Sequence, residues 1–209
     1  MHLADGIVPV SHALVGLVGG GLLTAVSLHR IRRLVDPQAL VPRAALVGAV
    51  FFAVTLISIP APPVSMHLVL CALTGILLGW FAVPVIVVGL FFQAILFGHG
   101  GLTTLGLNAL ILGVPALIAC GVWRLAGRQH RSNLLLGFAL GAGGVLVAVA
   151  LFVTVVLAGL PVHLDAQTER QALTLLVIAY LPLAVIEGIV TAATLGFLQR
   201  AGAGLLRHD

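Results

Sequence analysis

The fold class is decided by residues 83–97, VPVIVVGLFFQAILF, a run without a single charged side chain. Apolar and polar residues do not alternate along it, so the run is typical of a helix and not of a strand in a membrane barrel. It lies inside a longer stretch, residues 44–123, that contains no Asp, Glu, Lys or Arg. At about 1.5 Å per helical residue and about 30 Å of hydrocarbon, that stretch suffices for roughly four membrane crossings.

The composition of the whole chain agrees with this stretch. Of 209 residues, 61% are hydrophobic and only 8% are charged, and the mean hydropathy is +1.23. Such values exclude a soluble globular protein. We expect an all-α, polytopic protein in which residues 1–209 form a single integral membrane domain, with no internal repeat and no soluble domain. No basic segment precedes the first apolar run, so we expect no cleaved signal peptide and a mature chain that begins at Met1.

Apolar runs and the breakers between them predict about seven transmembrane helices. The third and fourth are short and are separated only by residues 80–84, so the pair could equally be one kinked element. The predicted helices are residues 9–29, 43–59, 66–81, 83–98, 105–125, 134–159 and 171–198.

The basic residues predict the orientation in the membrane. All ten are Arg, and in a seven-helix arrangement nine of them fall on one side, with Arg170 alone on the other. By the positive-inside rule the nine-Arg side is cytoplasmic, which puts the N-terminus outside and the C-terminus inside the cytoplasmic (inner) membrane. The Arg residues flank apolar runs, as topology determinants do, so they imply no nucleic-acid-binding surface. The nine are Arg30, Arg32, Arg33, Arg43, Arg124, Arg128, Arg131, Arg200 and Arg207.

Eight histidines carry most of the chemistry that the sequence offers. His29, His130 and His208 neighbour Arg residues, and solvation at the membrane interface explains them. His163 lies beside Asp165 in a polar exterior loop, where solvation is again a sufficient account. His12 is either an interfacial residue near the start of the first helix or a hydrogen-bond donor to a metal ligand.

His2 differs from the others because it follows the N-terminus directly. The free α-amine of Met1, the amide nitrogen of His2 and the His2 imidazole can close two fused chelate rings on one metal ion. In-plane nitrogen donors suit square-planar Ni(II), and also Co(II) or Cu(II), better than tetrahedral zinc. His67 follows a proline-rich exterior loop on the same side of the membrane, and we predict that it is the fourth donor. The amine must be free and the amide must lose its proton, so binding should weaken as the pH falls.

A glycine-rich segment, residues 98–108, is expected at the same exterior face. It offers His99, Thr103 and Asn108 among flexible glycines, which suits a lid over the metal or a shell of hydrogen bonds around its ligands. We expect Asp5 and Ser65, which lie close in sequence to His2 and His67, to belong to the same surroundings. His99 is an alternative direct ligand, and a plain loop is the simplest alternative for the segment.

Two further features concern the helices themselves. Glu187 is the only acidic residue deep in an apolar run, and we expect it to accept hydrogen bonds or to pair with an Arg, since a proton relay has too few members. Gly16 and Gly20 form a GxxxG step in the first predicted helix. This spacing permits close approach of a second helix, within the bundle or from a partner.

Four segments together resemble the CbiM/NikM family, the substrate-binding S components of energy-coupling-factor (ECF) transporters for cobalt and nickel. The resemblance extends from Met1 to about Phe197, and Ile7 departs from the aromatic residue that often follows Gly6 in the family. The segments are Met1–Gly6 (MHLADG), Ser65–Leu68 (SMHL), Phe97–Gly106 (FGHGGLTTLG) with Asn108, and Ile186–Ala192 (IEGIVTA).

The resemblance implies a seven-helix S component that binds Ni(II) or Co(II) as transported substrate through Met1, His2 and His67, and no other cofactor. It also implies a transmembrane coupling protein (T component), two cytoplasmic ATPase subunits and, in some members, a small accessory membrane subunit. The chain has no Walker A motif, so ATP hydrolysis would belong to those ATPase chains and this chain would not be an enzyme.

Two other classes of function compete with transport by an S component. A secondary metal transporter or channel driven by an ion gradient is disfavoured by the odd helix count, the lack of an inverted repeat and the single buried carboxylate. A membrane metalloenzyme would need an open coordination position and a general base, and Asp5 is the only acid nearby. The donor set does not separate nickel from cobalt.

Overall fold

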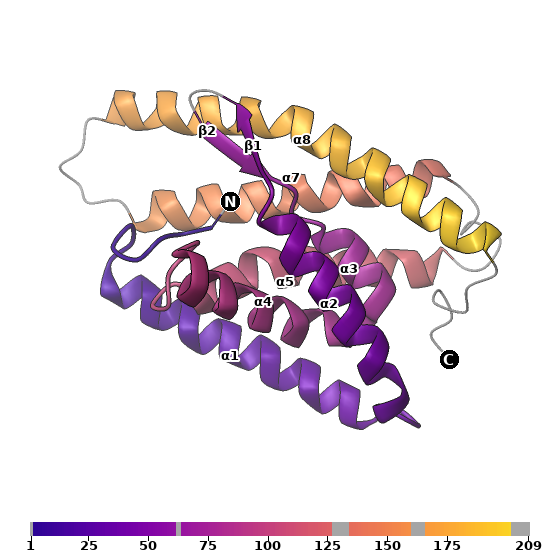
Figure 1. Cartoon of the computed structure of the whole chain (residues 1–209). Coiled ribbons are helices and arrows are strands. Elements are labelled where there is room, and N and C mark those ends of the chain that lie inside the picture. The colour runs from indigo at the N-terminus through magenta and orange to yellow at the C-terminus, as the bar shows by residue number, and fades with distance from the viewer. Residues whose placement is uncertain (1, 62–63, 127–133, 160–165, 202–209) are drawn as a thin grey trace.

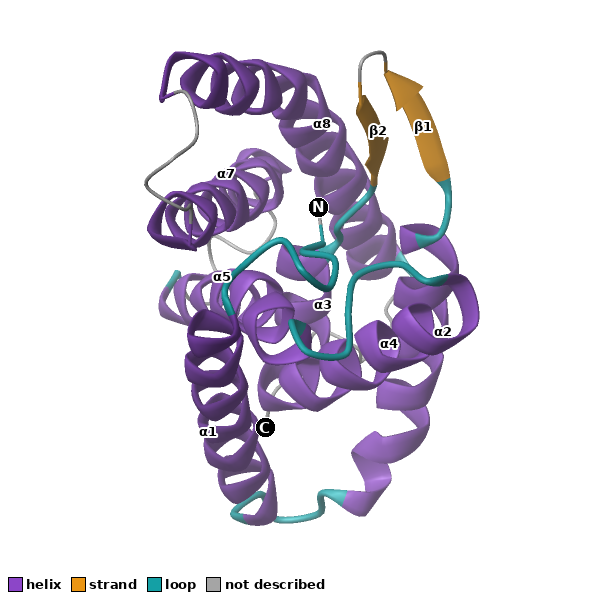
Figure 2. Ribbon diagram, turned by 90° about the vertical axis from the view of Figure 1, so that its left-hand side faces the viewer, coloured by secondary structure: helices purple, strands orange, loops and turns teal. Residues whose placement is uncertain are grey.

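The computed structural model describes residues 2–61, 64–126, 134–159 and 166–201, which form a helical bundle with one short β-hairpin (Figures 1 and 2). The elements are α1 (Val10–Arg32), η1 (Gln38–Leu40), α2 (Val41–Thr55), β1 (Ser58–Ala61), β2 (Val64–His67), α3 (Cys71–Leu78), η2 (Gly79–Phe81), α4 (Ala82–Phe97), α5 (Leu105–Leu125), α7 (Leu134–Gly159) and α8 (Ala166–Arg200). The bounds of α5 and α7 coincide with the predicted helices.

Six helical segments among the described residues are long and apolar enough to cross a membrane. The sequence predicts about seven helices, and the difference lies in the third and fourth, which are joined in one long helical segment, Cys71–Phe97. The reason is the length of α3, whose eight residues extend only about 12 Å and cannot cross about 30 Å of hydrocarbon alone. The other candidate spans are Val10–Arg32, Gln38–Thr55, Leu105–Leu125, Leu134–Gly159 and Val177–Arg200.

The segment Cys71–Phe97 begins and ends at the same end of the bundle. His67 precedes it and His99 follows it, and their ring centroids lie 5.1 Å apart. The turn at η2 reaches the opposite end, where the hydroxyl of Ser27 donates to the Trp80 carbonyl and Arg30 lies 5.5 Å from the Trp80 ring. The segment therefore enters the bundle as α3 and returns as α4.

The β-hairpin was not predicted. Residues 58–59 were assigned to the second helix and residues 66–67 to the third, yet these residues pair as antiparallel strands, Ser58 with His67 and Ile59 with Met66. Prolines at positions 60, 62 and 63 explain the difference, because a residue before proline avoids the helical region and favours extended backbone. Apart from this hairpin the described elements are helical, as predicted.

Helix α5 forms the centre of the bundle and contacts α1, α3, α4 and α7. Its buried side chains include Ile111, Leu112 and Trp123, while α1 leaves many large apolar side chains exposed, as expected of a helix that faces lipid. Helix α8 packs mainly along α7, and the two lie side by side in both views (Figures 1 and 2). The bundle thus surrounds the N-terminal segment with α5, α7 and the hairpin.

Candidate metal centre

The N-terminal segment is fixed by hydrogen bonds from Leu3 to the start of α5. The Leu3 amide donates to Oδ1 of Asn108 over 2.8 Å, and the Leu3 carbonyl accepts from Nδ2 of Asn108 over 3.0 Å and from Oγ1 of Thr104 over 2.6 Å. The Leu3 side chain is fully buried. Because both backbone groups of Leu3 are paired, the position of the preceding residue, His2, is fixed as well.

A second tether connects Asp5 to the loop before α5. Its carboxylate accepts hydrogen bonds from the amides of Leu102 (3.2 Å) and Thr103 (2.9 Å), and from the Thr103 hydroxyl. The hydroxyl of Thr103, assisted by these amides, lowers the pKa of Asp5 below its ordinary value. The loop passes so close that a Cβ atom at Gly101 would overlap the Asp5 carboxylate. This contact explains a glycine at position 101.

The same loop covers one side of His2. Gly100 has a φ of +81°, which favours glycine, and a Cβ atom there would lie 3.4 Å from Cβ of His2. The backbone of the glycine-rich segment therefore packs directly against the proposed ligand. Of the predicted surrounding residues, the structure brings Thr103 and Asn108 to the N-terminal segment that contains Asp5.

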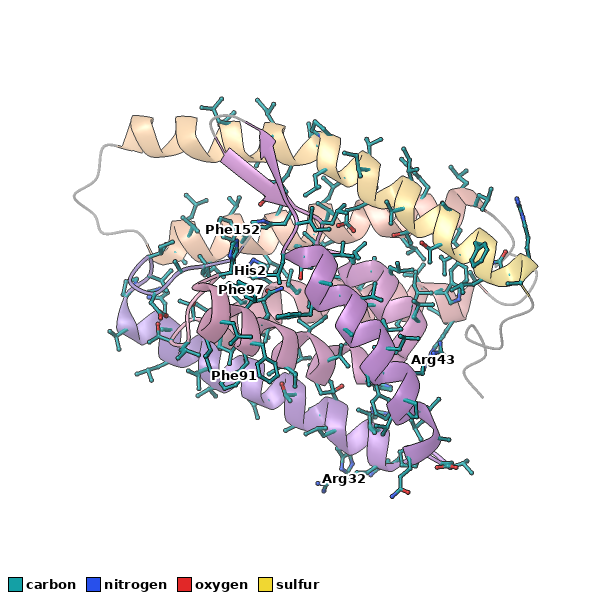
Figure 3. The ribbon with its side chains drawn as sticks, viewed as in Figure 1. His2, Arg32, Arg43, Phe91, Phe97 and Phe152 are labelled. Atoms are coloured by element: carbon teal, nitrogen blue, oxygen red, sulfur yellow. The ribbon has the colours of Figure 1, made fainter. Side chains whose placement is uncertain are left out.

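Three imidazoles lie in a row at this end of the bundle. The ring centroids of His2 and His67 are 5.9 Å apart, and those of His67 and His99 are 5.1 Å apart. The rings come from three different parts of the chain: the N-terminal segment, the end of β2, and the loop after α4. Figure 3 shows His2 inside the bundle, far from Arg32 at the end of α1.

Three of the four ring nitrogens of His2 and His67 lack a hydrogen-bond partner in the described part of the chain. Both ring nitrogens of His2 and Nδ1 of His67 are buried and accept or donate no hydrogen bond among the described residues. An unpaired buried polar group costs about 1–3 kcal/mol, so three of them in one place point to a ligand that pairs with them. Burial lowers the pKa of His2 well below its ordinary value and that of His67 to about 4. Both rings are therefore neutral near pH 7, with lone pairs available for a metal.

Protein side chains alone do not complete a metal site here. Within the described ranges, no three His, Cys, Asp or Glu side chains come together as metal ligands. The predicted donor set is of a different kind, because two of its four nitrogens are the amine and amide of the backbone. Met1 lies outside the described residues, as do His130, His163 and His208, and the side chain of Ser65 is likewise not described.

The remaining predicted residues lie apart from the imidazoles. His12 lines a pocket between α1, α5 and α7 with Leu107 and Thr154. Gly16 and Gly20 pack against the start of α5, where a Cβ atom at Gly20 would lie 2.7 Å from the Gly106 Cα. Their role within this structure is close packing of α1 on α5.

Glu187 contacts the segment that follows His67. Its carboxylate accepts hydrogen bonds from the backbone amides of Val69 and Leu70, and its side chain is 1% exposed. Sequence reasoning found Glu187 as an acid in an apolar helix but missed this partner. Backbone amides carry no side-chain signature, so no sequence signal identifies them.

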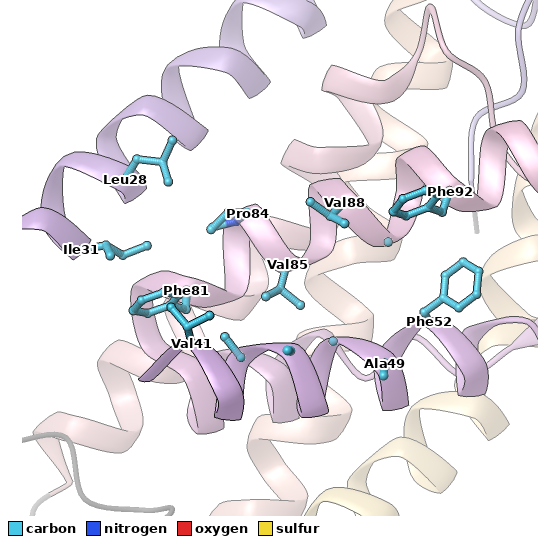
Figure 4. A pocket seen from close by; sticks show the side chains of 14 residues that line it. Leu28, Ile31, Val41, Ala49, Phe52, Phe81, Pro84, Val85, Val88 and Phe92 are labelled. Atoms are coloured by element: carbon cyan, nitrogen blue, oxygen red, sulfur yellow. The ribbon is translucent and has the colours of Figure 1, made fainter. Parts of the chain in front are cut away.

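An apolar groove elsewhere in the bundle has no chemistry suited to a metal. It lies between α1, α2 and α4, has a volume of about 490 Å³, and is lined by apolar residues such as Phe52, Val85 and Phe92 (Figure 4). A surface of this kind fits the hydrocarbon of a membrane. The imidazole row is therefore the candidate site.

Comparison with known proteins shows the family of the chain. Residues 2–205 match the family model of CbiM, described as the cobalt uptake substrate-specific transmembrane region. A cobalt transport protein CbiM from Sorangium cellulosum is 32% identical over 209 residues, which cover 95% of this chain and 91% of that one. A fused nickel transport protein NikMN from Rhodobacter capsulatus is 33% identical over 99% of this chain and 64% of its own length.

A solved crystal structure of a transition metal transporter shares the fold. It superposes with a TM-score of 0.82 at 22% sequence identity and covers 96% of this chain and 93% of that chain. The family match spans nearly the whole chain, and the similar proteins are transporters and not enzymes. This chain accordingly belongs to the CbiM family of cobalt and nickel transport proteins, which are multi-pass membrane proteins.

Proposed function

We propose that the chain is the substrate-binding S component of an ATP-driven ECF importer for Ni(II) or Co(II). In this proposal the ion is bound at the exterior face by four nitrogen atoms: the Met1 amine, the His2 amide, the His2 imidazole and the His67 imidazole. The family membership supports cobalt and nickel transport. The ligands and their geometry are our own inference.

The observation that carries the proposal is the pair of buried imidazoles of His2 and His67. Their ring centroids are 5.9 Å apart, and three of their nitrogens lack a partner among the described residues. A single ion between the rings can bind one nitrogen of each imidazole, and the amine and amide supply in-plane donors that Ni(II) and Co(II) accept. The hydrogen bonds of Leu3 and Asp5 support a preorganised chelate, because they hold the N-terminal segment in place before the ion arrives.

The proposed orientation has the N-terminus outside and the C-terminus in the cytoplasm. The entry and return of Cys71–Phe97 gives the chain seven passages between the two ends of the bundle, although α3 is short. Arg30, Arg43 and Arg124 lie at the end opposite His67, where Arg43 donates to the Leu77 carbonyl and Arg124 lies beside Gly79. This distribution supports a cytoplasmic location for that end.

The proposed partners are a transmembrane coupling protein, two cytoplasmic ATPase subunits and a small accessory membrane subunit. The fused NikMN relative, of which this chain covers 64%, supports the accessory subunit. A secondary transporter driven by an ion gradient is the alternative. It is less well supported, because the one carboxylate deep in the described helices, Glu187, is occupied by backbone hydrogen bonds.

Metal analysis of the purified protein tests the proposal. We expect one nickel or cobalt ion per chain, and loss of stoichiometric metal in His2→Ala and His67→Ala. An additional Ala ahead of Met1 should also abolish tight binding, because it separates the amine from the His2 chelate. His29→Ala is the matched control, since His29 is an exposed histidine at the far end of α1 and should retain metal.

Each variant is checked for folding by its elution as a single species in detergent. Tight, stoichiometric binding by the extended chain or by either histidine variant would contradict the proposed ligands. Uptake of nickel or cobalt by cells that contain this chain but lack the coupling protein and the ATPases would contradict the importer. It would favour the gradient-driven alternative.

A further inference from the structure

Glu187 is a buried acid that the proposed metal site does not use directly. It lies in α8, and among the described residues it is the one Asp, Glu or Arg whose side chain is buried. Its oxygens accept from the amides of Val69 and Leu70, with Leu70 at 2.9 and 3.0 Å. Removing a carboxylate from water is costly, so these hydrogen bonds are needed to hold it in the bundle. The pairing joins residues more than a hundred positions apart in the chain.

The amides that Glu187 binds belong to a strained turn directly after His67. Leu70 has a φ of +47°, and it is the one described residue other than glycine with a positive φ. A leucine avoids this conformation unless its surroundings impose it. The turn redirects the chain from β2 into α3 within three residues of His67. The orientation of the His67 ring therefore depends on the geometry of this turn.

Helix α8 connects this turn to the far end of the bundle. It contacts β2 and packs on α7 (Figure 2). Close packing beside Glu187 limits its freedom: a Cβ atom at Gly141 of α7 would lie 2.6 Å from the Glu187 carbonyl. A rotation or shift of α8 must therefore move the Glu187 carboxylate and, through it, the turn at Leu70.

We infer that Glu187 is a positioning residue for the His67 imidazole, and that it couples the position of α8 to metal affinity. The inference rests on the proposed function, because it requires His67 to be a ligand. Glu187 does not touch the ion. It holds the Val69–Leu70 turn so that His67 faces His2, and a displacement of α8 weakens this one donor while the N-terminal chelate stays intact.

A double-mutant cycle between Glu187 and His67 tests the inference. Nickel affinity is measured by equilibrium dialysis for the parent, Glu187→Gln, His67→Ala and the double variant, using the full-length protein in detergent. Gln keeps the size of the side chain but replaces one acceptor with a donor that faces the backbone amides. We expect at least a tenfold loss of affinity for Glu187→Gln in the parent, and less than a twofold further loss in the His67→Ala background.

Thr191→Val is the matched control. Thr191 lies one turn beyond Glu187 in α8, is fully buried, and its hydroxyl has no partner in the described part of the chain. Valine has nearly the same shape, so this variant alters α8 without disturbing the Leu70 turn, and nickel affinity should stay within twofold of the parent. If Glu187→Gln does not fold, Glu187→Asp serves instead, because it keeps the charge and retracts the carboxylate by one methylene.

The ligand-field absorption of the bound nickel supplies an independent readout. A loosened His67 should shift this spectrum in the Glu187 variant towards that of His67→Ala, whereas a purely structural role for Glu187 leaves it unchanged. Equal losses of affinity in both backgrounds, or no loss at all, overturn the inference. Such a result is distinct from failure of the proposed function, in which His67→Ala itself binds nickel like the parent.

Discussion

Burial of His2 and His67 makes the stability of the metal-free protein depend on pH. Both pKa values are lower in the folded protein than in the unfolded chain, where an imidazole titrates at about 6.5. The unfolded chain therefore binds more protons below pH 6.5. The free energy of unfolding should fall as the pH drops from about 6.5 through about 4, the pKa of folded His67, and should not change from this cause above pH 7.

For His67 alone we expect a loss of about 1–2 kcal/mol between pH 7 and pH 4.5, after allowance for solvent screening. Urea unfolding of the metal-free protein in detergent at these two pH values measures this loss of unfolding free energy. His67→Gln, which does not titrate, is the comparison that removes the contribution of the carboxylates. An equal pH dependence in the parent and His67→Gln would show that His67 is not held neutral by the fold.

The tether at Asp5 acts on metal affinity more than on stability. Asp5→Asn weakens the contacts to Leu102 and Thr103, so the N-terminal segment should be less preorganised and nickel affinity should fall about tenfold, equivalent to about 1.4 kcal/mol. The melting temperature should change little, because Asp5 is exposed. Asp36→Asn is the control: Asp36 is also exposed and accepts from the Ala39 amide, but it lies beyond the end of α1. Equal affinities for both variants would exclude the tether.

At the scale of elements, close contact between α1 and α5 depends on Gly20. A Cβ atom there would lie 2.5 Å from the Gly106 carbonyl oxygen, whereas a Cβ atom at Gly21 meets nothing within 4 Å. Gly20→Ala should therefore lower the free energy of unfolding by about 1–3 kcal/mol through overpacking. Gly21→Ala should be neutral or stabilise by up to about 1 kcal/mol, since alanine favours the helix. Thermal unfolding of the two variants in detergent compares them, and similar melting temperatures would contradict the packing.

The elements that sequence reasoning located are those defined by local properties. Helices α5 and α7 match the predicted bounds, because long apolar runs between Arg, Gly and Pro breakers determine membrane helices. The hairpin was missed although prolines at positions 60, 62 and 63 favour extended backbone there, and the start of α3 was missed because the turn before it involves contacts between distant residues. At this turn Leu70 has a positive φ and its amide donates to Glu187, a partner that no local pattern around Leu70 reveals.

The candidate site likewise has features that the sequence predicts and features that depend on the packed fold. Position at the exterior face and donor chemistry selected His2 and His67 from eight histidines, and the structure places their rings 5.9 Å apart. The hydrogen bonds between Leu3 and Asn108 could not be predicted from the sequence, since they join the backbone of the N-terminal segment to one face of α5. Composition predicts polar residues near the site, whereas their partners follow only from the packed fold.

At the scale of the whole molecule, the return of Cys71–Phe97 decides which ends of the chain share a side of the membrane. A single crossing by this segment would put Ile57 and Leu102 on opposite sides, whereas the contact between His67 and His99 puts them on the same side. Both are well exposed, at 60% and 48%, and so is Val35 beyond the end of α1. These three positions therefore report the topology.

Single cysteine substitutions at Ile57, Leu102 and Val35 test the topology when intact cells are treated with a membrane-impermeant maleimide. We expect Ile57→Cys and Leu102→Cys to be labelled at once, and Val35→Cys only after the membrane is permeabilised, because the Arg-rich end of the bundle faces the cytoplasm. Native Cys71 and Cys120 are buried, so the parent should give little background. If only Val35→Cys were labelled in intact cells, the orientation would be the reverse of the proposed one. His2 and His67 would then lie at the cytoplasmic face, where they could not capture an ion from outside.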